Sequence, residues 1–168
     1  MKIVVRIIRK IYFWIFYPIQ SPQLKLRWKL RLLSKAQRLS SKRLAWIVCN
    51  RIQATTGCHL SPQLKIPSTV AFPHPTGIVI GGGVCLGERV KIFQNVTLGG
   101  ARIGDAKESK YPEIGEGTVI FAGAVIVGKI KVGSNCIVGA NSVVTRDLPN
   151  NCVAVGAPAR IIEGGAEK

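Results

Sequence analysis

The chain has 168 residues, of which 47% are hydrophobic, and it carries a formal net charge of +16 at pH 7. This length suits one folded domain with an appendage, and the hydrophobic content is enough for a sizeable core. No run of about 18 apolar residues is present, which argues against a membrane-spanning helix. Residues 11–19 are apolar but lack a following small-residue cleavage site, so we expect no secretion.

The first part of the chain carries most of the charge. Residues 1–53 contain thirteen Lys and Arg and no acid, and the first acid is Glu88. Residues 54–168 contain eleven bases and eight acids, a net charge of +3. A strongly basic segment joined to a nearly neutral domain indicates a binding partner for the basic segment.

Two basic helical stretches are predicted in residues 1–56. Residues 1–19 are rich in Ile, Val and aromatic residues, and Pro18 and Pro22 end that helix. Residues 23–53 form the second stretch, whose candidate apolar face is made of Leu24, Trp28, Leu32, Leu39, Trp46 and Ile47.

The basic segment has three interpretations. Basic helices with aromatic residues bind the interface of anionic membranes, which favours peripheral contact through residues 1–53. Alternatively, the apolar face caps the following domain while the bases face water. No nucleic-acid motif accompanies the charge, so nucleic acid is the least favoured partner.

A six-residue repeat spans residues 57–156. This period fits neither a helix nor a flat strand, and three sides of six residues close a triangular coil. We therefore predict a mainly β fold, a parallel β-helix with a short α-helical N-terminal segment, and residues 157–168 as a C-terminal tail. The expected inward positions recur as Leu60, Leu64, Ile66, Val70, Phe72, Ile80, Val84, Leu86, Val90, Ile92, Val96, Leu98, Ile114, Thr118, Ile120, Ala124, Ile126, Ile130, Val132, Cys136, Val138, Ser142 and Val144.

The repeat is interrupted twice. Phe72 and Ile80 are eight residues apart instead of six, and His74 lies between two prolines in this interval. Leu98 and Ile114 are sixteen apart, so a loop of about ten extra residues leaves the coil there. Interruptions of a regular repeat are where a functional site is expected.

The five cysteines show no metal-type spacing such as CxxC. Free cysteines are among the most buried residue types, so packing is the favoured role. An odd count without framework spacing suits a reduced, cytoplasmic protein.

Three ordered motifs resemble serine O-acetyltransferases and related hexapeptide-repeat acetyltransferases of exopolysaccharide and lipopolysaccharide synthesis. They are His-Pro-Thr-Gly-Ile-Val-Ile-Gly from His74, Phe-Gln-Asn-Val-Thr-Leu-Gly-Gly from Phe93, and Val-Gly-Ala-Pro-Ala-Arg-Ile from Val155. The resemblance covers residues 57–162 and implies a left-handed coil and acetyl transfer from acetyl-CoA to a hydroxyl. It places the general base at His74 and the thioester near Gly99 and Gly100.

The resemblance also implies a homotrimer with its sites between subunits. It brings Ala122 and Ala140 against the pantetheine arm of CoA, and Arg160 suits the CoA phosphates. The two alanines are 18 positions apart in the sequence, which places them on successive coils. No metal is implied.

The expected acceptor region contains Gln94, Lys110 and Tyr111. Positions that would recognise serine differ from the family pattern. The Asp expected directly before His74 is Pro73, and the Asp expected to orient His74 aligns with His59. An Arg-His pair is replaced by Lys110-Tyr111 and a Glu by Gly82. The sequence therefore favours a sugar or polysaccharide-precursor hydroxyl as acceptor, with serine as the alternative. The expected location is cytoplasmic, with contact at the inner membrane face.

Two rival classes are less favoured. A zinc carbonic anhydrase on this fold needs three histidines, and the chain has two, His59 and His74. A non-catalytic trimeric scaffold predicts that replacing His74 changes no activity.

Overall fold

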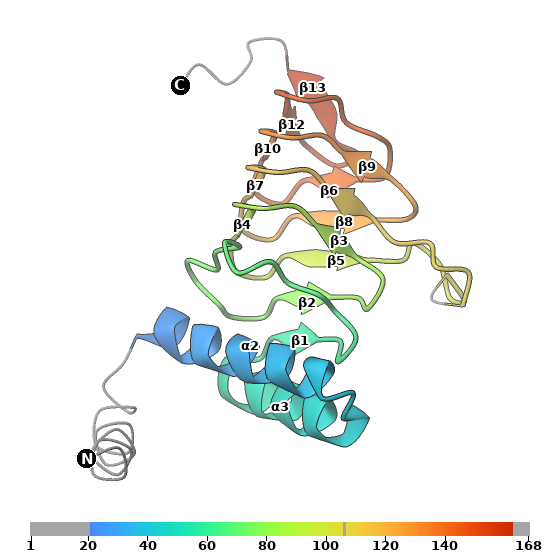
Figure 1. The fold of residues 1–168 in the computed structure, drawn as a ribbon. Coiled ribbons are helices and arrows are strands. Elements are labelled where there is room, and N and C mark those ends of the chain that lie inside the picture. Colours follow the sequence, from blue (N-terminus) through green and yellow to red (C-terminus); the bar gives the residue numbers. More distant parts are fainter. Residues whose placement is uncertain (1–20, 106, 163–168) are drawn as a thin grey trace, which may run out of the picture.

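The computed structural model describes residues 21–105 and 107–162, so the expected helix at 1–19 and residues 163–168 of the tail lie outside the described residues. Two helices pack across one end of a three-sided stack of short strands (Figure 1). The predicted mainly β architecture with a helical N-terminal segment is confirmed.

The strands form three sheets, one on each side of the coil. The first side consists of β1 (His59–Leu60), β2 (Val79–Ile80), β5 (Thr97–Gly99), β8 (Val125–Val127) and β11 (Val143–Val144). The second side consists of β4 (Lys91–Ile92), β7 (Val119–Ile120), β10 (Ile137–Val138), β12 (Val153–Val155) and β13 (Arg160–Ile162). The third side consists of β3 (Cys85–Leu86), β6 (Glu113–Ile114) and β9 (Lys131–Val132).

The strand register confirms the predicted period. Val79 pairs with Thr97, and Val119 pairs with Ile137, so in both pairs the partner comes one full three-sided coil later in the sequence. All predicted inward positions are buried except Ile66, which is partly buried against the core. Each coil therefore adds aliphatic side chains to one continuous core, and parallel backbone hydrogen bonds join it to the next coil.

The corners are built by residues that tolerate left-handed backbone conformations. Asn95, Asn135 and Asn141 all have φ between 55° and 58°. At the corner between the third and second sides, Gly115 stacks so closely on Gly133 that a Cβ on Gly115 would lie 2.5 Å from the Gly133 carbonyl carbon. Only glycine fits this corner without a backbone shift.

Both predicted interruptions appear as changes of register. Ala71 pairs with a residue 20 positions later, Lys91, whereas Val79 pairs with a residue 18 positions later, Thr97. The turn between Ala71 and Val79, which holds His74, therefore contains two extra residues. Cys85 pairs with Glu113, a separation that exceeds one regular coil by the ten residues of the predicted loop. This long loop projects from the stack after β5 (Figure 1).

The basic stretch predicted at 23–53 is two helices, α2 (Pro22–Arg38) and α3 (Lys42–Thr56). The Ser21 hydroxyl accepts a hydrogen bond from the Leu24 N–H, and Ser41 caps α3 in the same way. Ser40, with φ of 50°, makes the turn between the helices. The second serine cap is why the stretch divides here.

The predicted apolar face is not the face that packs against the solenoid, so that expectation is wrong. Leu24, Leu32, Leu39, Trp46 and Ile47 are exposed. The buried side of the helices is a different stripe, made of Leu26, Leu33, Ala36, Ala45, Val48, Cys49 and Ile52. The helices therefore cap the solenoid and also carry a second apolar surface that faces outward.

Lys29 on α2 forms side-chain hydrogen bonds to α3. Its Nζ donates hydrogen bonds to the Arg51 carbonyl, at 3.2 Å, and to the Thr55 hydroxyl. Burial, with the nearby charges of Lys25 and Arg51, lowers the pKa of Lys29. No described helix is both long enough and apolar enough to cross a bilayer.

Candidate functional site

His74 lies at the corner between the second and first sides, which we call the His74 corner (residues 73–78, 93–96, 121–124 and 139–142). Because Ala71 pairs with Lys91, the residues three positions further along, His74 and Gln94, lie at the same corner on successive coils. It then places Ala122 beside Gln94 and Ala140 beside Ala122. The predicted base, one predicted acceptor residue and two of the three predicted CoA residues thus follow one another along a single edge.

The His74 side chain is exposed and makes no hydrogen bond to any described residue. The backbone of its turn is fixed, because the Thr76 N–H donates to the His74 carbonyl at 2.8 Å and the side-chain amide of Gln23 donates to the Pro73 carbonyl. A loop acid such as Glu113 would be a candidate to orient the imidazole, but Glu113 lies on the third side and pairs with Lys131 at 3.6 Å. The imidazole is therefore presented at the surface, where a substrate hydroxyl can reach it.

Two aromatic rings, which the sequence did not single out, continue from His74 along the same corner. The His74 and Phe93 ring centroids are 6.0 Å apart, and the Phe93 and Phe121 rings stack at 5.1 Å with 17° between their planes. Both Phe residues directly follow a strand of the second side. The two Phe residues occupy the same outward-facing position on successive coils. An aromatic residue repeated at one position of the coil is the sequence signal that could have revealed this apolar wall.

Gln94 has an incomplete hydrogen-bond set. Its Oε1 is buried and has no partner among the described residues. A buried acceptor without a donor costs free energy, about 1–3 kcal/mol, so a donor from a substrate or a neighbouring copy would be stabilising.

Of the three residues predicted to bind CoA, Ala122 and Ala140 lie toward the C-terminal end of this edge, and Arg160 lies in β13. Ala122 is partly buried and Ala140 exposed, and the Asn141 N–H donates to the Ala122 carbonyl at 2.9 Å. Arg160 is exposed in β13, paired with Val155 at the end of the stack. The small side chains leave the edge open beside the Phe wall, which suits an extended pantetheine chain.

Gly99 and Gly100 lie at a different corner, between the first and third sides, which we call the loop corner (residues 81–84, 99–112 and 127–130). Nothing lies within 4 Å of a Cβ built on Gly99, so its backbone is accessible. Asp105, which the sequence did not single out, is buried, and its Oδ2 accepts from the N–H groups of Ala101 and Arg102 at 2.7 and 2.8 Å. This carboxylate organises the start of the loop.

The remaining acceptor candidates are engaged within the loop corner. The Lys110 Nζ pairs with the Glu108 carboxylate at 2.5 Å. The Tyr111 ring covers the preceding coil so closely that a Cβ on Gly81 would lie 2.5 Å from the ring, and one on Gly83 would lie closer still. Tyr111 therefore serves as the anchor of the loop on the solenoid.

One chain does not bring all predicted site residues together. His74, Gln94, Ala122 and Ala140 follow the His74 corner, whereas Gly99, Gly100, Lys110 and Tyr111 follow the loop corner. The first side of the coil separates these two edges. Among the described residues, no three His, Cys, Asp or Glu side chains gather as a metal-binding group.

Comparison with known proteins agrees with this architecture. Residues 111–146 match the family described as bacterial transferase hexapeptide (six repeats). The chain is 40% identical over 108 residues to the serine acetyltransferase of Staphylococcus aureus, an alignment that covers 64% of this chain and 50% of that protein. The chain thus spans about half the length of this curated relative.

Solved structures give the same result. A serine acetyltransferase in complex with CoA has 38% sequence identity and a TM-score of 0.70, and the match covers 80% of this chain and 54% of that one. Soybean serine acetyltransferase complexed with serine has 38% identity and a TM-score of 0.73, with 80% and 54% covered. The predicted left-handed parallel β-helix is confirmed by these neighbours. The chain thus carries hexapeptide repeats in a left-handed parallel β-helix, and it is similar to serine acetyltransferases over about half of their length.

Proposed function

We propose that the chain is an acetyl-CoA-dependent O-acetyltransferase with His74 as its general base. The observation that carries the proposal is the single edge on which an exposed histidine, an apolar wall and the small residues Ala122 and Ala140 follow one another. The CoA complex of a serine acetyltransferase of the same fold supports acetyl-CoA as the co-substrate.

The chemistry requires a base because a hydroxyl is a weak nucleophile at neutral pH. A ring nitrogen of His74 takes the hydroxyl proton as the acceptor oxygen attacks the thioester carbonyl carbon. Backbone N–H groups near Gly99 and Gly100 stabilise the oxyanion that forms. The carbon–sulfur bond then breaks, the acetyl group stays on the acceptor oxygen, and the CoA sulfur receives the proton from His74.

This scheme needs the His74 corner and the loop corner at one place. Since one chain holds them on different edges, we propose that the His74 corner of one copy meets the loop corner of a second copy. A homotrimer, in which every copy supplies both edges, satisfies this requirement with closed symmetry.

Serine is the acceptor that the comparisons favour, because the relatives described above are named serine acetyltransferases. They support this alternative better than the sugar hydroxyl favoured by the sequence. One observation keeps a sugar hydroxyl as the second candidate. Lys110 is paired with Glu108, so its ammonium group is not free for an amino-acid carboxylate, and the Tyr111 ring is packed on Gly81.

The test is an acceptor comparison with the purified full chain. Mass spectrometry would follow acetyl-CoA loss and product mass with serine, nucleotide sugars or glycans as acceptors. We expect O-acetylserine, and a loss of about 10²–10⁴-fold in kcat for His74→Ala. His59→Ala is the matched control, because His59 lies on β1 outside the His74 corner. Acetylation of sugars alone would select the second candidate. Full activity of His74→Ala would rule out His74 as the general base, and no acetylation of any acceptor would leave only a scaffold.

We also propose a cytoplasmic location. The five cysteines, all in the described residues, are free thiols, which suits a reducing compartment.

A further inference from the structure

Helix α2 carries a row of cations on the side that faces away from the core. Arg27, Arg31, Lys35 and Arg38 are spaced by four, four and three residues, so they lie along one side of the helix. All four side chains are exposed. We call these residues the cation row.

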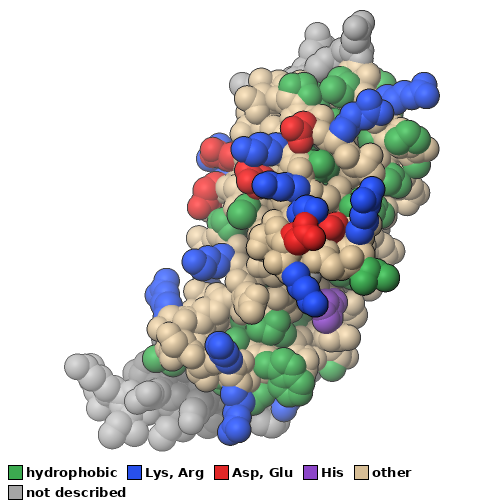
Figure 2. Space-filling view, turned by 90° about the vertical axis from the view of Figure 1, so that its right-hand side faces the viewer, with side chains coloured by type: hydrophobic (Ala, Val, Ile, Leu, Met, Phe, Trp, Pro, Cys, Tyr) green, Lys and Arg blue, Asp and Glu red, His purple; other side chains and the backbone are tan. Residues whose placement is uncertain are grey.

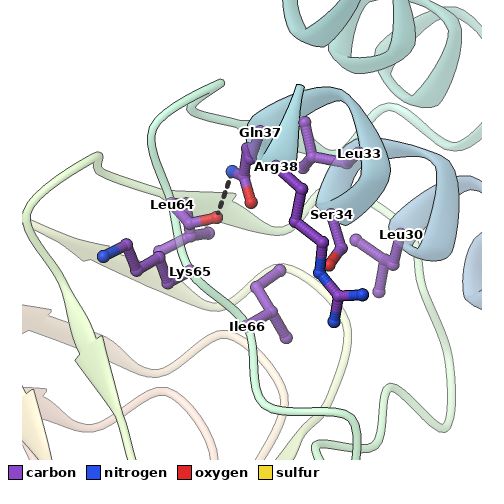
Figure 3. Close-up of a pocket in the computed structure, with 8 residues that line it drawn as sticks. All are labelled: Leu30, Leu33, Ser34, Gln37, Arg38, Leu64, Lys65 and Ile66. Atoms are coloured by element: carbon purple, nitrogen blue, oxygen red, sulfur yellow. Dashed lines mark hydrogen bonds between the residues drawn. The ribbon is translucent and has the colours of Figure 1, made fainter. Parts of the chain in front are cut away.

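A groove runs between the cation row and residues 66–70. It has a volume of about 470 Å³, and Leu30 and Ile66, both partly buried against the core, form its apolar floor. A second hollow of about 310 Å³ shares Leu30, Arg38 and Ile66 with it, and Figure 3 shows Arg38 reaching from α2 across this hollow.

The second hollow is held open by Gln37. Its Nε2 donates at 3.0 Å to the carbonyls of Pro62 and Leu64, which fixes the distance between α2 and the solenoid. The groove is therefore a formed feature of the fold, with an apolar floor and a cationic rim.

No acid balances the cations. Helices α2 and α3 contain nine Lys and Arg and no Asp or Glu, and the sequence has no acid before Glu88. Within the described ranges, no member of the cation row forms an ion pair. In Figure 2 the acidic side chains appear toward the end opposite the helices, while Lys and Arg extend to the helical end.

An exposed apolar row lies beside the cation row. Leu24 and Leu32 on α2, and Leu39 directly after the helix, are 42%, 52% and 73% exposed, and Trp46 and Ile47 on α3 are also exposed. The Arg31 guanidinium lies 5.5 Å from the centroid of the Trp28 ring. A cation row flanked by exposed Leu and Trp is the pattern of a helix that lies in the plane of a membrane interface.

We propose that α2 and α3 bind the surface of an anionic lipid bilayer. Lipid phosphate groups pair with the cation row over the groove, and the exposed Leu and Trp side chains enter the boundary between headgroups and acyl chains. The charge supports this occupant directly, since two helices with nine bases and no acid are complementary to anionic lipid. The binding is independent of the acetyl-transfer proposal, because the surface lies outside both corners of the site.

Co-sedimentation of the full chain with vesicles tests the proposal. One vesicle set is pure phosphatidylcholine, and the other contains about one third phosphatidylglycerol. We expect binding to the anionic set, weakened as salt screens the charges. The variant with Arg27→Gln, Arg31→Gln, Lys35→Gln and Arg38→Gln should lose about fivefold in affinity for each cation removed.

The matched control removes four exposed cations from the solenoid: Lys91→Gln, Lys129→Gln, Lys131→Gln and Arg146→Gln. It makes the same change in net charge and should bind vesicles within about twofold of the unchanged chain, because charges beyond a Debye length are screened. Circular dichroism and thermal melting check that both variants are folded. Equal vesicle binding by both variants overturns the proposal, as does binding of a 20-base-pair DNA duplex with no binding of anionic vesicles.

Discussion

The Gln23 side-chain amide donates a hydrogen bond to the carbonyl oxygen of Pro73, the residue that precedes His74. This hydrogen bond connects helix α2 to the turn that carries His74 and contains the two extra residues. Gln23 is a positioning residue in this arrangement, since it touches the turn and not the reacting groups.

Removing this contact should lower turnover without weakening CoA binding. We expect Gln23→Ala and Gln23→Glu to reduce kcat by about two- to tenfold, the range for one lost hydrogen bond, with an unchanged KM for acetyl-CoA. An ionised Glu keeps the size but loses the donor. Gln53→Ala, an exposed position on α3, is the control. A wild-type kcat for both Gln23 variants would remove its positioning role.

Larger side chains at the alanines should obstruct the CoA edge. We expect Ala122→Leu and Ala140→Leu to raise the KM for acetyl-CoA at least tenfold, because a branched side chain would occupy the path beside the stacked Phe93 and Phe121 rings. The acceptor KM should change little. Ala54→Leu on the exposed side of α3 is the control for the substitution itself. An unchanged KM for both variants would place CoA elsewhere.

The glycine stack predicts a local stability effect. Gly115→Ala forces a Cβ to within 2.5 Å of the Gly133 carbonyl carbon, so the backbone of one coil must shift. Overpacking of this kind costs about 1–3 kcal/mol. A fall in Tm of several degrees is expected, measured by calorimetry. Gly99→Ala has open space around the new Cβ and should melt like the unchanged chain.

The buried thiols predict a stability change at high pH. Cys152 lies with its Sγ 3.4 Å from the Cys136 Sγ, and burial, followed by the contact with Cys136, raises the pKa of Cys152 from 9.0 to about 11. The fold thus favours the neutral thiol. This contribution is complete below pH 9 and is lost as the pH rises through about 11.

Urea unfolding at pH 8 and pH 10.5 measures this effect. The unchanged chain should lose more of its unfolding free energy between these values than Cys152→Ala, which has no thiol to ionise. At pH 8 a thiol reagent should label the exposed Cys85 first and Cys152 only after unfolding. Rapid labelling of Cys152 in the folded chain would contradict the prediction.

The six-residue spacing predicted the coil, its inward residues and both interruptions, because every coil repeats the same burial requirement. It could not reveal Gln23 or Asp105, whose roles depend on a contact between distant parts of the chain and on contacts within an irregular loop. The outward-facing stripe of α2 was mistaken for its buried stripe, because Leu occupies both sides of the helix. The separation of His74 from Gly99 could have been predicted from the period. Ile80 and Leu98 are 18 positions apart and therefore share one side of the coil, with His74 before the first and Gly99 after the second.

The two ends of the stack determine how copies of the chain can associate. At one end α2 and α3 pack across the coil beyond β1, and at the other β13 reverses direction and runs antiparallel to β12. A second copy therefore finds no continuing parallel edge to extend, so growth of the coil into a fibre is blocked at both ends. The trimer proposed above uses only the long sides of the stack, because there the edge of one copy would face the edge of the next.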